Sequence, residues 1–304
     1  MKYLIIGAGG TGGALGGYMA KAGKDVTIIA RGEHLKAIRE NGGLKVVRPN
    51  DTFTAPVKAC TMEEYSETPD VIFVCVKGYS LEETIPFIDQ VAGIETIVIP
   101  ILNIYGTGGK LQEELPGLLV TDGCIYVASQ KSAPGEILMS GYILRVAFGV
   151  RKEEEYRPEL EQIKADLDES EVTGILSDNI RRDALLKFSY VSPQNGCGLY
   201  YDIPAGPMQE PGKYRDLFAQ LVHEIDVLAN AMDIHFEEDI VARNLKILDD
   251  LAPEMTTSLQ KDVAAGRASE IDGLVYEVVR MGKEYGVELP GYEMVAEEVK
   301  KRLG

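Results

Sequence analysis

Short, nearly uninterrupted apolar segments alternate with amphipathic segments through the first half of the chain. Residues 71–76 and 96–102 contain few polar side chains, which is typical of parallel strands covered by helices on both faces. Apolar residues recur at helical spacing around residues 35–40 and over residues 81–91, where we expect helices. The pattern predicts an α/β domain built on a parallel sheet.

The pattern changes to helical periodicity from about residue 180, which predicts an all-helical second domain. We place the boundary within residues 173–177, so that the α/β domain covers residues 1–176 and the all-α domain covers residues 177–304. The helices expected in the second domain cover residues 181–190, 214–232, 237–249, 259–265, 270–285 and 292–303.

The last part of the first domain is rich in expected strands. Within residues 118–150, turns are expected at Pro134 with Gly135 and at Gly141 with Tyr142. We expect these strands to complete the sheet of the first domain.

The loop after the first strand, residues 3–6, carries the glycine spacing of a dinucleotide-binding fold. In that geometry Gly7 makes a tight turn, Gly9 lets the backbone approach a pyrophosphate, and Gly12 lets the following helix pack on the strand. A second strand, residues 26–30, follows at the βαβ spacing. A glycine-rich turn without a ligand is the alternative. The sequence predicts a Rossmann-type dinucleotide-binding domain, whose loop consists of Gly7, Ala8, Gly9, Gly10, Thr11 and Gly12.

The residue after the second strand indicates which nucleotide is bound. A site for NAD usually has Asp or Glu there for the ribose 2′-hydroxyl, whereas a site for NADP has a cation for the 2′-phosphate. This chain has Arg31, whose guanidinium can stack on adenine and pair with phosphate. Alternatively, Arg31 is a solvated cation offset by Glu33. We expect NADP(H).

Polar residues follow further strands of the predicted sheet. Lys77 and Asn103 come after two of the apolar segments, as Gly7 and Arg31 follow the first two strands. Ligands of parallel sheets bind beyond the carboxyl ends of the strands. We therefore expect all four residues at one ligand-binding edge, although Lys77 or Asn103 taken singly could be an ordinary loop residue.

Composition narrows the class of protein. The chain has 304 residues, 45% hydrophobic content and a net charge of −17, which disfavours nucleic acids and anionic membrane surfaces as partners. No apolar run has the roughly 18 residues of a membrane span. The four cysteines form no CxxC pattern and the three histidines form no paired motif, so no metal site is expected. A cytoplasmic enzyme is expected.

Three residues of the helical half are candidates for catalysis or binding. Lys187 lies in an unusually apolar helical segment, and a lysine can protonate a carbonyl oxygen when burial lowers its pKa. The alternative is a lysine that extends from an amphipathic helix into solvent. Glu270 could equally be a first-turn carboxylate, with Ser269 and Asp272 as a capping box, and Ser258 could be a helix N-cap.

Taken together, the motifs resemble the ketopantoate reductase family, the NADPH-dependent 2-dehydropantoate 2-reductases, along essentially the whole chain. The resemblance implies a helical second domain similar to the C-terminal domain of 6-phosphogluconate dehydrogenase. The segments that carry it are residues 7–12 with Arg31, 76–79, 102–103, 126–128 with Pro134 and Gly135, 182–187, Asn195, Ser258 and 269–273.

The resemblance also implies roles for individual residues. Lys187 would be the general acid, and Glu270 would order the site near the nicotinamide and the lysine. Asn103 and Asn195 would hold cofactor and substrate, and Ser258 would contact the substrate carboxylate. The implied cofactor-binding residues are Gly7, Ala8, Gly9, Gly10, Thr11, Gly12, Arg31, Lys77, Asn103, Ala128 and Glu270. The implied reaction reduces ketopantoate, a 2-oxo acid, to pantoate for pantothenate and coenzyme A synthesis.

Three positions depart from the family pattern. Ile104 replaces a glycine after Asn103, and Val191 and Ala205 stand where the family commonly has asparagines. Such changes can alter which 2-oxo acid is accepted. Three alternatives therefore stay open: a reductase of another 2-oxo acid, a hydroxyacid dehydrogenase of similar architecture, and a non-catalytic NADP(H)-binding sensor. The sequence is compatible with a homodimer.

Overall fold

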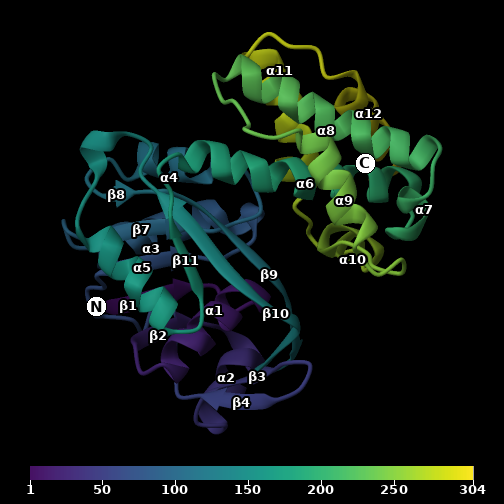
Figure 1. The fold of residues 1–304 in the computed structure, drawn as a ribbon. Coiled ribbons are helices and arrows are strands. Elements are labelled where there is room, and N and C mark those ends of the chain that lie inside the picture. Colours follow the sequence, from purple (N-terminus) through teal and green to yellow (C-terminus); the bar gives the residue numbers. More distant parts are fainter. Residues whose placement is uncertain (304) are drawn as a thin grey trace. The chain divides into compact units, whose positions relative to one another are not determined.

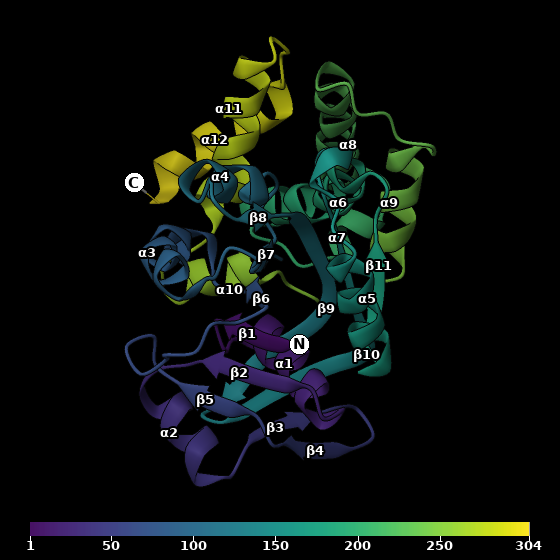
Figure 2. The same ribbon diagram turned by 90° about the vertical axis from the view of Figure 1, so that its left-hand side faces the viewer.

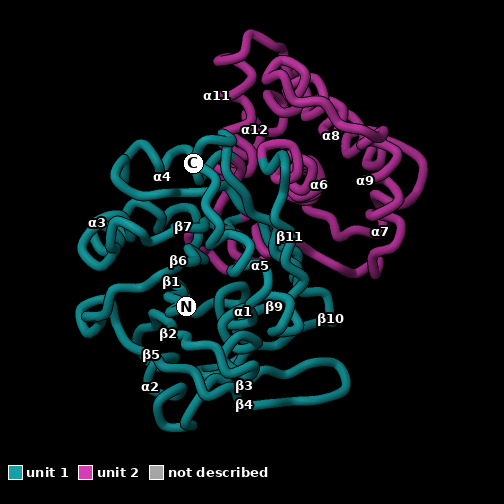
Figure 3. The backbone as a smooth tube through the Cα atoms, turned by 60° about the vertical axis from the view of Figure 1, so that its left-hand side comes forward, with its two compact units in different colours: residues 1–102, 106–180 teal, residues 103–105, 181–304 magenta. Residues whose placement is uncertain are grey.

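The computed structural model describes residues 1–303 and groups them into two compact units (Figure 3). Unit 1 comprises Met1–Leu102 and Gly106–Ile180, and unit 2 comprises Asn103–Tyr105 and the chain from Arg181 onward. The main division therefore falls a few residues after the predicted boundary. The short loop Asn103–Tyr105, which the prediction assigned to the first domain, packs with unit 2.

A six-stranded parallel sheet forms the centre of unit 1 (Figure 1). Its spatial order, β5-β2-β1-β6-β7-β8, has the first strand in the middle and later strands on either side, which is the doubly wound order of nucleotide-binding domains. The α/β prediction is confirmed. The strands are β1 (Lys2–Ile6), β2 (Asp25–Ile29), β5 (Lys58–Cys60), β6 (Val71–Val74), β7 (Ile97–Pro100) and β8 (Leu119–Val120).

Helices cover both faces of this sheet because its strands are apolar on both faces. One face packs Leu4 and Ile72 against Phe87 and Ile88 of α3, whereas Tyr3 and its neighbours on the other face pack against α1. The helices of unit 1 are α1 (Gly10–Lys21), α2 (Gly32–Glu40), α3 (Leu81–Val91), α4 (Thr107–Glu114) and α5 (Glu159–Glu169), with short 3₁₀ turns at Gly78–Ser80 and Glu153–Glu155.

The expectation that residues 118–150 complete this sheet was wrong apart from β8. The two long strands β9 and β10, joined by a turn at Pro134 and Gly135, belong to a second, five-stranded sheet (Figure 2). In this sheet β10 also pairs with β3 and β11, which come from distant parts of the chain. The strands are β3 (Leu44–Val47), β4 (Thr52–Ala55), β9 (Asp122–Ala133), β10 (Glu136–Gly149) and β11 (Thr173–Leu176).

The turn expected at Gly141 and Tyr142 is a bulge instead. Strand β10 continues through both residues, and its register with β9 shifts between Met139 and Leu144. The extra residues of β10 bulge outward, and the hydrogen-bonded pairing with β9 resumes beyond them. Tyr142 is accordingly 51% exposed.

Helix α1 packs against both sheets because glycines remove side chains from two of its faces. A Cβ added to Gly16 would lie 2.7 Å from Ile28 of the parallel sheet, and one added to Gly13 would lie 2.7 Å from Ile137 of the second sheet. Interiors this dense leave no room for an extra methyl group without displacement. Glycines that follow the predicted nucleotide loop thus allow the layered packing of α1.

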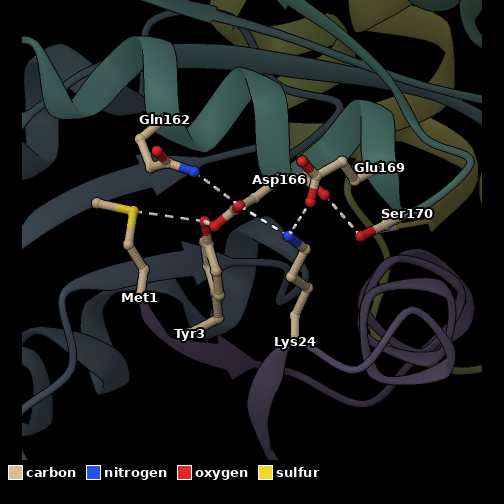
Figure 4. A network of polar contacts seen from close by, with 7 residues as sticks. All are labelled: Met1, Tyr3, Lys24, Gln162, Asp166, Glu169 and Ser170. Carbon is tan, nitrogen blue, oxygen red and sulfur yellow. Dashed lines mark hydrogen bonds and ion pairs between the residues drawn. The ribbon is translucent and has the colours of Figure 1, made fainter.

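A buried polar network attaches α5 to the central sheet (Figure 4). The Asp166 carboxylate accepts hydrogen bonds from Tyr3 Oη at 2.5 Å, Lys24 Nζ at 2.8 Å and Gln162 Nε2 at 2.9 Å. Burial opposes ionisation of Asp166, but these hydrogen bonds hold its pKa below the ordinary value. The ionised carboxylate is therefore the favoured form in the folded unit.

Unit 2 is helical, as predicted, and has its own apolar core around residues such as Leu185, Phe218 and Tyr292. None of the helices within residues 1–303 is long and apolar enough to cross a membrane. The helices are α6 (Ile180–Tyr201), α7 (Gly206–Gln209), α8 (Lys213–Ala231), α9 (Ile240–Asp249), α10 (Ser258–Ala264), α11 (Glu277–Glu284) and α12 (Pro290–Leu303), with a π-helical turn at Asp272–Tyr276.

Helix α6 extends well beyond its expected end at Tyr190 because a side chain compensates for an internal proline. Pro193 has no N–H to donate to the carbonyl of Ser189 four residues earlier. Asn244 of α9, which is fully buried, donates from Nδ2 to that carbonyl at 2.9 Å. The helix can therefore continue through Pro193 to Tyr201.

Candidate functional site

The glycine loop of unit 1 adopts the geometry that its sequence predicts. Gly7 has φ +105°, and a Cβ added to it would lie 2.9 Å from the carbonyl oxygen of Cys75. A Cβ added to Gly12 would collide with the Gly7 carbonyl. Both positions therefore require glycine, one for its backbone conformation and both for close packing.

The start of α1 fits a dinucleotide pyrophosphate. Within the described chain, no side chain caps the first amides of α1, and the first turn has no acidic residue. A Cβ added to Gly9 would meet nothing within 4 Å, so this side of the loop is open. Gly10, in contrast, packs against Ser129 of β9, which is the neighbour of Ala128. Unpaired helix N-terminal amides attract phosphate oxygens.

Two cations follow the strands on either side of β1. Arg31 follows β2 and precedes α2, and Lys77 follows β6 and precedes the Gly78–Ser80 turn. Since β2 and β6 both pair in parallel with β1, these residues lie at the same edge of the sheet as Gly7. Arg31 is exposed, and among residues 1–303 its guanidinium has no hydrogen-bond or ion-pair partner. It is thus available for an anionic ligand.

His34 lies one turn after Arg31 and was not recognised as a site residue from the sequence. It is buried, and its Nδ1 accepts a hydrogen bond from the N–H of Gly135 at 2.9 Å. Burial lowers the pKa of His34, and the charge of Lys131 lowers it further. A neutral His34 therefore links the start of α2 to the β9–β10 turn. The sequence did contain a sign of this burial, because His34 lies on the same apolar face of α2 as Leu35 and Ile38.

In unit 2 the structure brings Lys187 and Asn103 together. Lys187 Nζ donates a hydrogen bond to Asn103 Oδ1 at 2.6 Å, and Lys187 is only 8% exposed. The loop that carries Asn103 is packed on α6, since the Tyr105 ring lies 6.2 Å from that of Phe188. The buried ammonium is thus held in one orientation by a neutral oxygen.

Asn195 lies two helical turns beyond Lys187 on α6, with Val191 between them. Asn195 Nδ2 donates to the Val191 carbonyl at 2.7 Å, while its Oδ1 is buried without a hydrogen-bond partner in the described chain. At 1.5 Å rise per residue, side chains four and eight positions apart lie near one face of the helix. Ala205 is also buried.

Glu270 is buried two residues before the π-helical turn begins at Asp272, with 5% exposure. Three residues later, Gly273 packs directly under Ile104, the neighbour of Asn103. Turns of this kind occur frequently at functional sites. The capping box considered for Ser269 and Asp272 is not formed: the helix start lacks a side-chain cap, and Asp272 pairs with Arg280 at 2.8 and 2.9 Å.

Ser258 is not the N-cap that its sequence context suggested. Thr257 caps α10 and forms a capping box with Gln260, because Thr257 Oγ1 accepts from the Gln260 N–H at 3.2 Å. Ser258 is instead the first residue of the helix and is exposed. Its hydroxyl has no hydrogen-bond partner within residues 1–303.

Comparison with known proteins identifies the family. A model described as "Ketopantoate reductase PanE/ApbA" matches residues 3–153, and one described as "Ketopantoate reductase PanE/ApbA C terminal" matches residues 179–303. The chain belongs to the ketopantoate reductase family. The family assignment made from the motifs is therefore confirmed, and the chain is a member of a family of oxidoreductases.

Relatives within and around the ketopantoate reductase family match along nearly their full length. A 2-dehydropantoate 2-reductase from Mesorhizobium japonicum is 29% identical, with 93% of this chain and 92% of that protein covered. The structure of the 2-dehydropantoate 2-reductase from Porphyromonas gingivalis W83 has a TM-score of 0.84 at 27% identity and covers 98% and 99% of the two chains. A D-mandelate dehydrogenase bound to NADH and anilino(oxo)acetate has a TM-score of 0.88 at 22% identity and covers 99% and 98%.

Proposed function

We propose that this protein is an NADPH-dependent reductase that converts a 2-oxo acid to the corresponding 2-hydroxy acid. The observation that carries the proposal is the buried Lys187 ammonium, held at 2.6 Å by Asn103 Oδ1. A buried, oriented N–H group in a dinucleotide-binding oxidoreductase is suited to protonate a carbonyl oxygen.

Four free cysteines in the described chain accord with a reducing compartment, and we propose a cytoplasmic location.

Lys187 has the role of general acid in this proposal. The chemistry that a bound NADPH supplies is a hydride for the keto carbon of the substrate. As the C=O bond becomes a C–O single bond, Lys187 Nζ gives a proton to the oxygen and is reprotonated from solvent. Asn103 holds the ammonium in position, and Glu270 orders the same part of unit 2. The product is the 2-hydroxy acid.

The residues of unit 1 would bind the nucleotide. The open side of Gly9 and the uncapped amides of α1 are suited to the pyrophosphate, and Lys77 and Ala128 would contribute at the same sheet edge or beside it. Arg31 supports NADPH over NADH for two reasons. Its exposed guanidinium lacks a partner in the described chain, and it stands at the position where an NAD site usually has an acidic residue. NADH is the competing cofactor, since the related D-mandelate dehydrogenase binds it.

Ketopantoate is the first substrate candidate. Relatives named 2-dehydropantoate 2-reductase match this chain along nearly its full length. Asn195 and Ser258 would then contact the substrate, the latter at its carboxylate. A different 2-oxo acid is the second candidate. It is favoured by Ile104, Val191 and Ala205, which replace the glycine and asparagines expected in the family, and by the anilino(oxo)acetate ligand of the D-mandelate dehydrogenase.

The test is the rate of NADPH oxidation, followed at 340 nm, by the purified protein with ketopantoate and a panel of other 2-oxo acids. Saturable turnover with at least one of them, weaker with NADH than with NADPH, is the expected result. Nucleotide binding without turnover of any 2-oxo acid would contradict the proposal and favour a sensor.

A further inference from the structure

The side chain next to Asn103 is fixed against the π-helical turn of unit 2. A Cβ added to Gly273 would lie 2.7 Å from Cγ1 and 2.9 Å from Cγ2 of Ile104. Ile104 therefore occupies the space that a side chain at position 273 would take. Because Gly273 carries no side chain, the bulk at this point comes from the loop.

The loop cannot easily carry Ile104 away from this position. Tyr105, the next residue, packs its ring 6.2 Å from Phe188, and Phe188 directly follows Lys187 on α6. On the other side of Ile104, the Asn103 side chain is hydrogen-bonded to Lys187. Ile104 is held between two anchored residues, so it lies next to the Lys187–Asn103 pair as a fixed apolar group.

A second apolar side chain lies beyond Lys187 on α6. Val191 is one turn further along the helix and, like Ile104, is only partly buried against the core of unit 2. The polar residue another turn away, Asn195, directs its Nδ2 back to the Val191 carbonyl and has its Oδ1 buried. Ile104 and Val191 thus add partly exposed hydrocarbon to this part of unit 2, alongside the polar side chain of Asn103.

Building on the proposed reductase function, we infer that this chain prefers 2-oxo acids with a hydrocarbon side chain over those whose side chain carries a hydroxyl. Ile104 and Val191 are the residues that determine this preference. Apolar side chains offer a substrate hydroxyl no hydrogen bond, and a hydroxyl that loses water without gaining a partner is penalised. Discrimination of this kind is typically about tenfold to a hundredfold in kcat/KM.

Two compounds that differ by one hydroxyl test the inference. These are 3,3-dimethyl-2-oxobutanoate and its 4-hydroxy derivative, ketopantoate. We expect kcat/KM with NADPH to be roughly tenfold or more higher for the compound without the hydroxyl. Val191→Asn, which introduces donor and acceptor atoms beside the lysine, should move the ratio toward the hydroxylated compound.

Two further variants make the test independent of one substitution. Ile104→Ala should raise kcat/KM for a bulkier substrate, phenylglyoxylate, relative to 3,3-dimethyl-2-oxobutanoate, since it removes bulk beside Asn103. Ile94→Ala is the matched control, because Ile94 is 70% exposed and belongs to unit 1. It should leave both ratios unchanged, and circular dichroism verifies that each variant is folded.

The outcomes separate this inference from the function on which it rests. The deciding quantity is the ratio of kcat/KM for 3,3-dimethyl-2-oxobutanoate to kcat/KM for ketopantoate. A wild-type ratio above one that falls in Val191→Asn supports the inference. A ratio of one or below, or a ratio that Val191→Asn leaves unchanged, overturns the inference while the reductase function stands. If NADPH binds but neither compound nor any other 2-oxo acid is reduced, the proposed function itself fails.

Discussion

Arg31 and Lys187 are the two cations on which the proposed chemistry depends, and they lie in different environments. Arg31 is exposed after β2 with no partner for its guanidinium in the described chain, whereas Lys187 is buried with Asn103 Oδ1 at 2.6 Å. An exposed, unpaired guanidinium can bind an incoming anion, and a buried ammonium can deliver a proton to one atom. These environments support different roles for the two residues.

Arg31→Ala should weaken NADPH binding by roughly tenfold or more, because charge-assisted hydrogen bonds to the 2′-phosphate are lost. NADH binding should change little, since NADH has a hydroxyl at that position. Nucleotide fluorescence titrations measure both dissociation constants. Arg39→Ala is the control, because Arg39 lies on α2, the helix that follows Arg31, but already pairs with Glu64 at 2.5 Å. Equal losses for both nucleotides would exclude a contact with the 2′-phosphate.

His34 should make stability fall as pH drops below the ordinary pKa of histidine, about 6.5. Burial lowers its pKa in the folded protein, so its stabilisation is complete above the ordinary value of about 6.5. It is lost as pH falls through the folded pKa, because the unfolded chain binds the proton more readily. His34→Asn should preserve an acceptor for the Gly135 N–H but cannot titrate.

The predicted observation is a smaller fall in thermal midpoint between pH 7.5 and 5.5 for His34→Asn than for the wild type. His235→Asn provides the control, since the His235 side chain is 68% exposed, and it should keep the wild-type pH dependence. An identical fall for the wild type and His34→Asn would show that His34 has no part in the transition.

At the level of whole helices, α6 shows how a distant residue decides where an element ends. Pro193 and the glycines after it suggest a helix end by local rules. Asn244, 55 positions away from Ser189, supplies the missing donor to the Ser189 carbonyl. Lys187, Val191 and Asn195 consequently lie on one continuous helix.

Asn244→Ala should destabilise unit 2 by about 1–3 kcal/mol, the typical cost of leaving a buried carbonyl unpaired. The thermal midpoint and the hydrogen exchange of α6 amides near Pro193 measure the effect. Asn230→Ala removes a similar amide-to-carbonyl bond at an exposed position and should cost much less. If the two variants have the same midpoint, Asn244 does not support the helix.

The same contrast explains which elements the sequence could predict. The strands of the parallel sheet were predictable because each is a local apolar run between turns, and the helices of unit 2 because their periodicity is local. The second sheet was not, since β10 pairs with β3 almost a hundred residues earlier and with β11 well after it. Pairing between such distant segments leaves no local pattern.

The site shows a similar limit. The turn of the glycine loop and the position of Arg31 after β2 were predictable because a βαβ nucleotide-binding fold requires a fixed spacing within one segment. Lys187 and Asn103 are 84 positions apart, so only the family resemblance connected them before the structure did. The packing of Ile104 on Gly273 had no sequence signal, because neither residue type indicates the other.

Across the whole molecule, the nucleotide loop and the lysine belong to units with separate apolar cores. Nucleotide binding and proton donation should therefore be separable by mutation. A ligand that binds the folded state raises its stability according to concentration and affinity. NADPH should accordingly raise the thermal midpoints of both the wild type and Lys187→Ala.

The most direct test of the account is the turnover number of Lys187→Ala for the best 2-oxo acid at saturating NADPH, with nucleotide binding measured in parallel. We expect unimpaired NADPH binding and a fall in kcat of roughly a hundredfold or more, the usual contribution of a general acid. Lys300→Ala, at an exposed lysine of α12, should retain full activity. A kcat for Lys187→Ala within a few-fold of the wild type would contradict the account.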